Sequence, residues 1–371
     1  MSAVKAINMK TKVQALQNKL SCVAKQSLGR KFGALYDKVY RKDVLMVAWQ
    51  KVRKNKGAPG VDELDFEYIE EEIGVERFLE ELHDELKWYT YRPTPVLRCW
   101  IDKPGKTEKR PLGIPIIKDR VAQMAAKMVM EPIFETSFLE CSHGFRPERS
   151  QHTAIEQIRC TLTFEHMTQV IDADIKGCFN NINHSILIKL IKKRIADPHM
   201  IRLIKGWLKA GVMDAGVYYE AMDIGTPQGG VISPLLSNIY LHSFDKMFEQ
   251  SGIRGKLVRY ADDFVIMVKD NAKRVLGVIR KLLKRLGLEL HHGKTRIVSA
   301  RKGFDFLSAH FRVTPVTKRG SWLKESCKLW PSNGAIKRIK QKIRDEIGRR
   351  YSLSLEEMIQ ELNPTIRGWN N

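Results

Sequence analysis

The sequence contains no run of about 18 apolar residues, the length that a membrane-spanning helix needs, and its basic N-terminus has no apolar signal core. It also has no C-x-x-C pair, which argues against a zinc site or a disulfide framework. Its six cysteines are scattered: Cys22, Cys99, Cys141, Cys160, Cys178 and Cys327. We therefore expect a cytoplasmic protein with reduced thiols and no membrane association.

The sequence also has few acidic residues relative to its basic residues. The 371 residues include 64 Lys and Arg against 42 Asp and Glu, a net charge of +22. With 43% hydrophobic and 29% charged residues, the chain can build a packed core, so the excess charge does not indicate disorder. A charge of this size favours a polyanionic partner, most simply nucleic acid, over a basic protein without such a partner.

The positive charge is concentrated at the two ends. Residues 1–56 carry 14 basic and 2 acidic residues, 57–90 carry 12 acidic and 2 basic residues, and 311–371 carry 13 basic and 6 acidic residues. Such ends can neutralise phosphates and make binding salt-dependent, although a solvated helix surface is the simpler alternative. The basic residues expected to contact nucleic acid are Lys54 and Lys56 in the N-terminal arm and Lys337, Arg338 and Lys340 in a late helix.

Helical periodicities and short apolar runs occur without regular βαβ alternation, which predicts an α+β fold. Helices are predicted at 10–27, 43–54, 66–87, 119–139, 150–163, 183–194, 199–210, 234–250, 272–287, 332–350 and 354–362. Strands are predicted at 96–101, 168–175, 217–222, 297–299, 304–311 and on both sides of 261–263 within 256–268. Gly and Pro predict a loop at 55–62 and a turn at 225–230.

Four acids carry the chemistry that we expect. Asp262 and Asp263 lie between two apolar runs at a predicted hairpin tip, where a divalent cation would offset their repulsion. Oxygen ligands without His or Cys suit Mg²⁺, whereas an ordinary turn would explain a lone Asp pair. Asp172 and Asp174 end a second apolar strand. Three carboxylates converging on two ions would serve phosphoryl transfer, but spacing alone does not choose between Asp172 and Asp174.

Several motifs resemble those of one known family. Tyr-Ala-Asp-Asp at 260–263 resembles the signature of reverse transcriptases, and GTPQGGVISPLLSNI at 225–239 resembles the block that precedes it in the enzymes encoded by bacterial group II introns. Further similar blocks follow the family's order: NKGAPGVD at 55–62, KRPLGIP at 109–115, SHGFRP at 142–147, DIKGCF at 174–179, HHGKTR at 291–296 and FDFL at 304–307. Because the blocks are collinear, the chain is identified as a member of this family.

The resemblance implies which residues act in catalysis. It makes Asp174, ahead of Asp172, the acid that holds two Mg²⁺ ions together with Asp262 and Asp263, and Mn²⁺ would be accepted in their place. Incoming dNTPs, an RNA template with its DNA primer, and group II intron RNA are the implied partners, and the resemblance allows a dimer.

The resemblance also implies a nucleotide site made of Lys103, Arg110, Phe179, Gln228 and Lys294. Phe179 would lie beneath the incoming sugar and reject a 2′-hydroxyl by its bulk. Arg146 would contact the template backbone. From the residues alone, a packing role for Phe179, a surface ion pair for Lys103, a plain turn around Gln228 and internal packing of Arg146 remain alternatives.

The implied architecture is a right hand of fingers, palm and partial helical thumb, in which the palm is an antiparallel sheet packed on helices. The expected divisions are a basic extension and start of the fingers at 1–90, fingers at 91–165, palm at 166–312 and the start of the thumb or maturase domain at 313–371. Two blocks depart from the family, with Ser308-Ala309 in place of Gly and V-D-E-L at 61–64 in place of V-D-G.

The thumb-like segment ends early. The family's thumb continues beyond the point where Trp369-Asn370-Asn371 stand, so we expect a trimmed, degenerate or naturally short relative in which the apolar face of 332–350 is incompletely covered. The function that follows is an RNA-directed DNA polymerase that copies intron RNA and assists splicing. The alternatives are an RNA-binding splicing cofactor with little polymerase activity, and a similar enzyme acting in phage defence or CRISPR adaptation.

Overall fold

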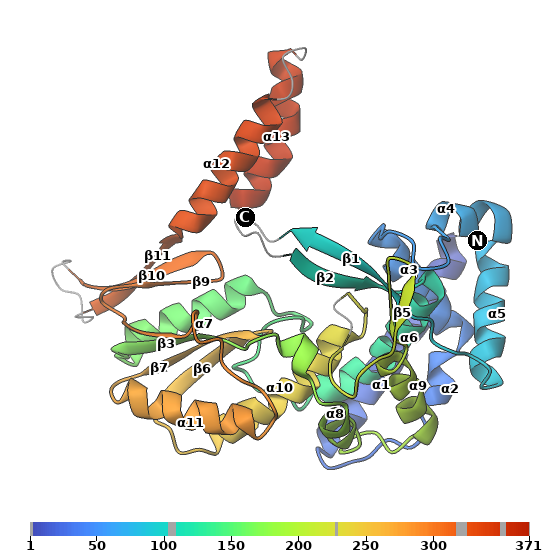
Figure 1. The fold of residues 1–371 in the computed structure, drawn as a ribbon, viewed down its shortest axis with the longest axis horizontal. Helices are drawn as coiled ribbons and strands as arrows, with labels where there is room; N and C mark the ends of the chain where they lie inside the picture. The colour runs from blue at the N-terminus through green and yellow to red at the C-terminus, as the bar shows by residue number, and fades with distance from the viewer. Residues whose placement is uncertain (1–2, 103–108, 227–228, 317–324, 349–353, 371) are drawn as a thin grey trace.

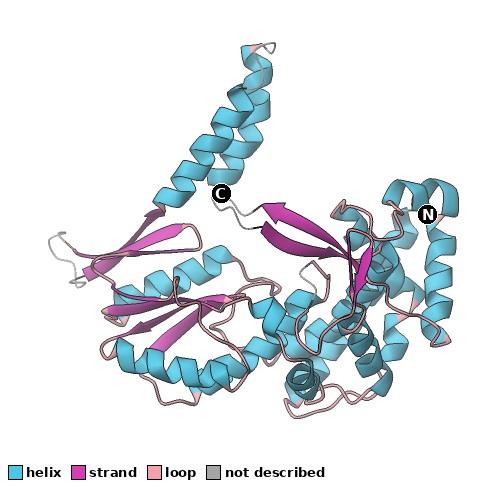
Figure 2. Ribbon diagram, viewed as in Figure 1, coloured by secondary structure: helices cyan, strands magenta, loops and turns pink. Residues whose placement is uncertain are grey.

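The computed structural model describes residues 3–102, 109–226, 229–316, 325–348 and 354–370. Figure 1 shows two halves and an arm: a sheet flanked by helices, a helix-rich half that carries a second sheet, and a helical pair that rises away from the body. Figure 2 shows how strands and helices mix along the chain, as an α+β fold requires. No helix in these described segments is long and apolar enough to cross a membrane.

The first half is built on a four-stranded antiparallel sheet in the order β6-β7-β3-β8. Its strands are β3 (Gln169–Asp174), β6 (Gly255–Tyr260), β7 (Asp263–Val268) and β8 (Arg296–Ser299). The two strands predicted within 256–268 are therefore confirmed, and the residues between them form a tight hairpin turn.

Both faces of this sheet are buried. Its strands carry consecutive apolar residues, and successive side chains of a strand point to opposite faces. Val170, Val265 and Met267 pack with helix α7 (Gln151–Phe164) and with the sheet β11-β10-β9. On the other face, Ile171 and Ile266 join a large helical core that includes α10 (Ser233–Glu249) and α11 (Ala272–Lys284). Figure 1 shows α7 on one side of the sheet and α11 on the other, so the expected antiparallel sheet packed on helices is confirmed.

The second half holds most of the remaining helices. They are α1 (Ala3–Gln26), α2 (Tyr36–Val39), α3 (Lys42–Lys54), α4 (Phe66–Tyr68), the π-helix η1 (Ile69–Ile73), α5 (Val75–Lys87), α6 (Ile117–Glu135), the 3₁₀ turn η2 (Cys178–Asn181), α8 (His184–Ile191) and α9 (Pro198–Leu208). Its sheet has the order β2-β1-β4-β5, with β1 (Val96–Asp102), β2 (Lys109–Ile114), β4 (Val212–Asp214) and β5 (Val217–Tyr219). Helix α6 is almost wholly buried and forms the axis of this half.

A three-stranded sheet leads to the arm. It consists of β9 (Phe304–Phe306), β10 (Ala309–Pro315) and β11 (Glu325–Pro331), and the arm is the pair α12 (Asn333–Gly348) and α13 (Leu355–Asn370). Ala335 is the one buried residue recorded for α12, and Ile347, Ile359 and Trp369 are exposed. On the apolar face predicted for 332–350, Ile347 is exposed, whereas Ile336, Ile339 and Ile343 are half-buried.

Four sequence predictions need correction. The single strand predicted at 304–311 is a hairpin, because Leu307 and Ser308 both take positive φ values, 50° and 68°, and turn the chain between β9 and β10. The strand predicted at 217–222 ends at Tyr219. The helix predicted at 354–362 continues to Asn370 with Pro364 inside it. The single helix predicted at 66–87 is divided into α4, the π-helix η1 and α5, with Gly74 at φ 82° before α5. In addition, strands β2, β4 and β11 were not predicted, since they are short or rich in charge and lack clear alternation.

Candidate active site

Three carboxylates meet at one edge of the β6-β7-β3-β8 sheet. Asp263 begins β7 and pairs across the hairpin with Tyr260, which leaves Ala261 and Asp262 as the two turn residues. Asp174 ends β3 directly opposite Asp263 in the ladder. A two-residue hairpin and a strand end therefore bring Asp174, Asp262 and Asp263 together, as their positions in the sequence predicted.

The turn itself is strained. Ala261 has a φ of 56°, which lies in the left-handed region that favours Gly. It is the first of the two turn residues, a position that Gly often occupies in such hairpins. A side chain held there costs of order 1–3 kcal/mol, so the surrounding contacts must fix the turn.

The electrostatics of this edge favour a cation. Removal from water, followed by the charge of Asp174, raises the pKa of Asp262, while Arg110 and Lys294 oppose the shift. Removal from water and the charges of Asp262 and Asp174 raise the pKa of Asp263 to about 6. Like-charged oxygens without His or Cys are the donor set that Mg²⁺ and Mn²⁺ accept, so the residues fit the expected ions.

Lys294 lies against this carboxylate group. Its ammonium donates a short hydrogen bond to Asp174, and this bond and the charges of the three acids raise the pKa of Lys294. Within the described segments, no three His, Cys, Asp or Glu side chains are arranged to hold a metal as they stand.

Asp172 is separated from the group by its own partner. Arg296 donates to the Asp172 carboxylate at 3.1 and 3.2 Å, and Asp172 lies opposite Val265 rather than opposite an acid. The geometry distinguishes the two acids that sequence spacing left equivalent, with Asp174 beside the hairpin acids and Asp172 in an ion pair.

A fully buried arginine holds the hairpin from behind. Arg259 and Asp245 of α10 are both 0% exposed and form a bidentate ion pair at 2.9 and 2.6 Å. Although burial alone would lower the pKa of the Arg259 guanidinium, the charge and hydrogen bonds of Asp245 raise it. Arg259 also donates to the carbonyl oxygen of Ala261 at 2.9 Å, and so ties the strained turn to helix α10. Sequence reasoning did not identify this residue.

The SHGFRP segment supplies the other side of this network. Arg259 donates to the Ser142 hydroxyl at 2.8 Å, and the His143 N–H donates to the Arg259 carbonyl at 2.8 Å. Gly144 lies so close to the hairpin that a Cβ on it would be 2.3 Å from the Ala261 nitrogen. Only glycine fits at this point of contact.

Arg146 is not available to a template, and this expectation is corrected. Its side chain is 4% exposed, forms an ion pair with Glu135 at 2.6 Å, and donates to the carbonyl oxygens of Leu139 and Ser142. Burial with satisfied donors is a packing role, the alternative that the residues alone had left open.

A groove of about 510 Å³ lies between the second sheet and the strand-to-helix junction after β3. Its lining includes Arg98 of β1, Leu112 of β2, Asn180 of η2 and the loop residues Gly225 and Thr226. The volume falls within the range of about 300–1,000 Å³ that suits a nucleotide-sized ligand. Phe179, which is half-buried, immediately precedes the lining residue Asn180.

Backbone hydrogen bonds fix the rim of this groove. The Gly225 N–H donates to the carbonyl of Ile182, and the Thr226 N–H donates to the carbonyl of Phe179, both at 2.8 Å. Gly229, at φ +115°, approaches Gly113 of β2 so closely that a Cβ would be 2.4 Å from its oxygen. Gly225 and Thr226 therefore contact η2 and the residue after it, and Gly229 contacts β2, while Gln228 lies outside the described residues.

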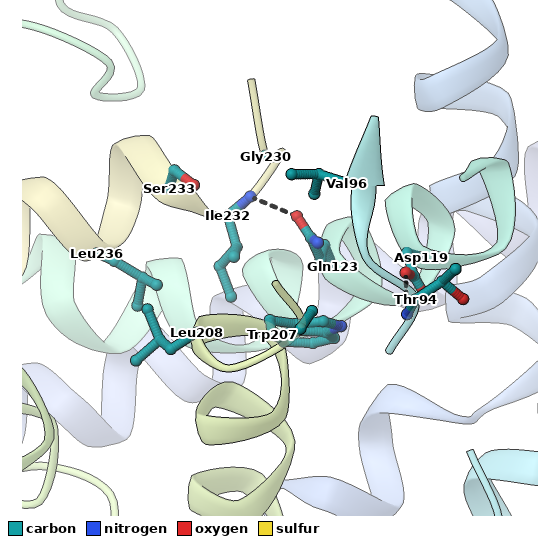
Figure 3. A pocket seen from close by; sticks show the side chains of 11 residues that line it. Thr94, Val96, Asp119, Gln123, Trp207, Leu208, Gly230, Ile232, Ser233 and Leu236 are labelled. Carbon is teal, nitrogen blue, oxygen red and sulfur yellow. Dashed lines mark hydrogen bonds between the residues drawn. The ribbon is translucent and has the colours of Figure 1, made fainter. Parts of the chain in front are cut away.

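Helix α6 anchors this rim from below. The Ile232 N–H donates to Gln123 and the Thr94 N–H donates to Asp119, as Figure 3 shows around a cavity of about 10 Å³. Such a cavity holds one water at most, so the packing is close. One buried helix thus positions both the start of β1 and the loop before α10.

Those remaining predicted site residues that the structure describes lie on the surface. Arg110 of β2 is exposed and lies close enough to influence the pKa of Asp262, and Lys103 lies outside the described residues. Lys54, Lys56, Lys337 and Lys340 are exposed. Arg338 is exposed and donates to the Ser308 hydroxyl at 2.9 Å, which links α12 to the β9–β10 turn at the position where the sequence departs from the family.

An acidic hairpin at the edge of a four-stranded antiparallel sheet packed on helices is the arrangement of a polymerase palm. Residues 101–311 match the family described as reverse transcriptase (RNA-dependent DNA polymerase), and residues 336–371 match the group II intron, maturase-specific domain. The chain belongs to the group II intron-encoded branch of the reverse transcriptase family.

Named relatives support this placement. The chain is 35% identical to the protein YkfC of Escherichia coli over 338 residues, which cover 80% of this chain and 87% of YkfC. It is 32% identical to the group II intron-encoded protein LtrA of Lactococcus lactis over 384 aligned positions, which cover 85% of this chain and 62% of LtrA. It is also 28% identical to a putative COX1/OXI3 intron 2 protein of Saccharomyces cerevisiae over 74% of this chain and 38% of that protein. The chain thus spans less than two thirds of LtrA.

Proposed function

We propose that the chain is an RNA-directed DNA polymerase, in which a primer 3′-hydroxyl attacks the α-phosphate of a dNTP and pyrophosphate leaves. The observation that carries this proposal is the meeting of Asp174, Asp262 and Asp263 at one sheet edge in a chain of this family. The groove beside Phe179 and Thr226 is of the size that the nucleotide needs.

Asp174, Asp262 and Asp263 would hold the divalent cations. Bound there, two Mg²⁺ ions would lower the pKa of the attacking hydroxyl and neutralise charge on the phosphates. Lys294 and Arg110 would bind phosphate oxygens, because both cations already influence the pKa of Asp262. Phe179 would exclude ribonucleotides, and Lys103 and Gln228 are assigned to the nucleotide by the resemblance alone.

The proposed partners are an RNA template with its DNA primer and group II intron RNA, whose splicing the protein would assist. The match to the maturase-specific domain supports the splicing role. A hollow of about 540 Å³ along α1 is lined by Lys12, Lys19 and Arg30, which makes it a candidate surface for that RNA. The six free cysteines fit a cytoplasmic location.

Primer extension tests the proposal. The full chain is given poly(rA), oligo(dT), dTTP and Mg²⁺ beside two variants, Asp262→Ala and the matched control Asp172→Ala. We expect product from the wild-type chain and from Asp172→Ala, and none from Asp262→Ala, with RNA binding retained by all three. Undiminished synthesis by Asp262→Ala would refute the assignment of the site.

The same assay distinguishes the polymerase from the alternative function. If the wild-type chain binds RNA but extends no primer in Mg²⁺ or Mn²⁺, the polymerase proposal fails and an RNA-binding splicing cofactor becomes the better description. Raising the salt concentration should weaken binding, because phosphate contacts release counterions.

A further inference from the structure

A second hollow lies on the helix-rich half, away from the acidic hairpin. It has a volume of about 210 Å³, and its lining includes Tyr36, Tyr89, Arg92, His199 and Arg202. These residues come from α2, the end of α5, the segment before β1, and α9. Figure 1 places α2, α9 and the end of α5 on the opposite side of the molecule from β3, β6 and β7. We call this site the aromatic pocket.

The aromatic rings of the pocket are packed against one another. Tyr36 and Tyr89 stack with ring centroids 5.5 Å apart and planes 14° apart, and the His199 ring lies 4.3 Å from Tyr89. Tyr36 is buried and its hydroxyl donates to the Leu86 carbonyl at 2.8 Å, so its ring is fixed. Tyr89 is 45% exposed, and it presents an aromatic surface to solvent from a rigid support.

Tyr89 occupies a position that normally belongs to glycine. Its φ is 61°, and the Tyr89 and Thr90 N–H groups donate to the carbonyls of Leu86 and Glu85, the pattern of a helix C-terminus closed by a left-handed residue. A tyrosine held there is strained where glycine would not be. Strain of this kind often accompanies a functional site.

The charges around the aromatic pocket favour an anion. Arg202 is exposed, and no ion pair or hydrogen bond joins it to another side chain in the described segments. His199, Arg202, Lys205 and Lys209 lie along α9 and the residue after it, at spacings of three to four residues, and all are exposed.

Three acids on the segments around the pocket already have partners. Asp37 pairs with Lys38 at 2.9 Å, and Glu85 pairs with Lys118 at 2.8 Å. Asp197 is buried and accepts four backbone N–H groups, including those of Tyr36 and Met200. Within the stripe, Lys209 faces Asp223 at 4.0 Å, whereas no ion pair joins Arg202 or Lys205 to an acid in the described segments.

We propose that the aromatic pocket binds one unpaired base of an RNA strand, whose phosphates follow the basic stripe of α9. A base stacks on tyrosine whatever its identity, and arginine adds a planar cation to the stack and to the phosphate. A volume of about 210 Å³ is below the range for drug-sized ligands, so it admits one ring system. The inference rests on the proposed RNA-binding function but concerns a surface separate from the polymerase site.

The test uses the full chain and a fluorescein-labelled single-stranded oligo(rU), measured by anisotropy. Arg202→Ala and Tyr89→Gly should each weaken binding about 5- to 100-fold, the loss expected for one stacked base. Arg280→Ala, an exposed arginine on α11, is the matched control and should leave binding unchanged. Because glycine suits the φ of residue 89, Tyr89→Gly should keep the melting temperature, which separates lost binding from lost folding.

Photocrosslinking gives an independent readout. An oligo(rU) containing 5-iodouridine should crosslink to Tyr89 or His199 in the wild-type chain, located by mass spectrometry, and the crosslink should fall in Arg202→Ala. Unchanged affinity in both variants, or crosslinks that avoid the pocket, would overturn the proposal and leave a protein partner as the occupant to seek. Primer extension by the same variants should stay near wild type. If instead the wild-type chain fails to extend, that failure concerns the polymerase proposal and not this pocket.

Discussion

Removal of the Asp245 charge should destabilise the protein and disable its hairpin. In Asp245→Asn, the side chain keeps its shape and one oxygen acceptor, but Arg259 remains fully buried without a counter-ion. Breaking a buried pair in this way costs about 3–5 kcal/mol. That is a large fraction of the roughly 5–15 kcal/mol that stabilises a typical domain.

A double variant separates stability from positioning. Arg259→Met with Asp245→Leu removes both charges, and apolar replacements of buried ion pairs are often neutral or stabilising. Here the guanidinium also serves the Ala261 carbonyl, the Ser142 hydroxyl and the Asn238 side chain. Each oxygen left unsatisfied costs about 1–3 kcal/mol, so we expect partial recovery of stability. We do not expect recovery of activity, since the Ala261 turn loses its tether.

Two measurements check this reasoning. Urea denaturation followed by circular dichroism gives the free energy of unfolding, with Asp270→Asn as a control for an exposed acid, expected within about 0.5 kcal/mol of wild type. Single-nucleotide extension gives kcat and KM, and kcat of the double variant should fall about 100-fold, the effect of a misplacement of about 1 Å. Its KM for dTTP should change little. A double variant with wild-type kcat would refute the positioning role of Arg259.

Three further substitutions have expected outcomes. Gly144→Ala places a Cβ 2.3 Å from the Ala261 nitrogen, so it should cost about 1–3 kcal/mol of stability in urea and lower kcat in extension assays. His242 is partly buried with both ring nitrogens unpaired, and burial lowers its pKa to about 4. The unfolded chain binds a proton at His242 below about pH 6.5, whereas the folded chain does not until near pH 4, so the free energy of unfolding falls with pH. Between pH 7.5 and pH 5, the free energy of unfolding should therefore fall by about 2 kcal/mol more in wild type than in His242→Leu. Phe179→Val should raise incorporation of rUTP relative to dTTP by about 10- to 200-fold in competition assays; an unchanged ratio would return Phe179 to a packing role.

The acidic hairpin could be predicted from sequence because its signals are local. Two apolar runs flanking Asp262 and Asp263 require a hairpin, and an apolar run ending on Asp174 requires a neighbouring strand. The choice between Asp172 and Asp174 needed the ladder register, which places Asp174 opposite Asp263 and gives Asp172 to Arg296.

Contacts between segments that are distant in the sequence could not be predicted from it. From the sequence, Arg146 was predicted to contact nucleic acid. The structure shows instead that it pairs with Glu135 and donates to two carbonyl oxygens. The pocket around Tyr89 joins four segments, and sequence alone gives no sign that a helix ends there on a tyrosine at positive φ. Burial and turn geometry, unlike periodicity, depend on the whole fold.

The Arg259 network gives a physical reason why three of the matching blocks occur together in one chain. The SHGFRP block contributes Ser142 and Gly144, which contacts the hairpin. The GTPQGG…SNI block contributes Asn238 of helix α10. The hairpin block contributes Arg259 and the strained Ala261 carbonyl. None of these residues needs to touch a substrate, yet each fixes a turn whose own conformation costs free energy. Substitutions in the first two blocks should therefore act on the rate of synthesis through the position of Asp262, and compensating pairs should be found across the blocks rather than within them.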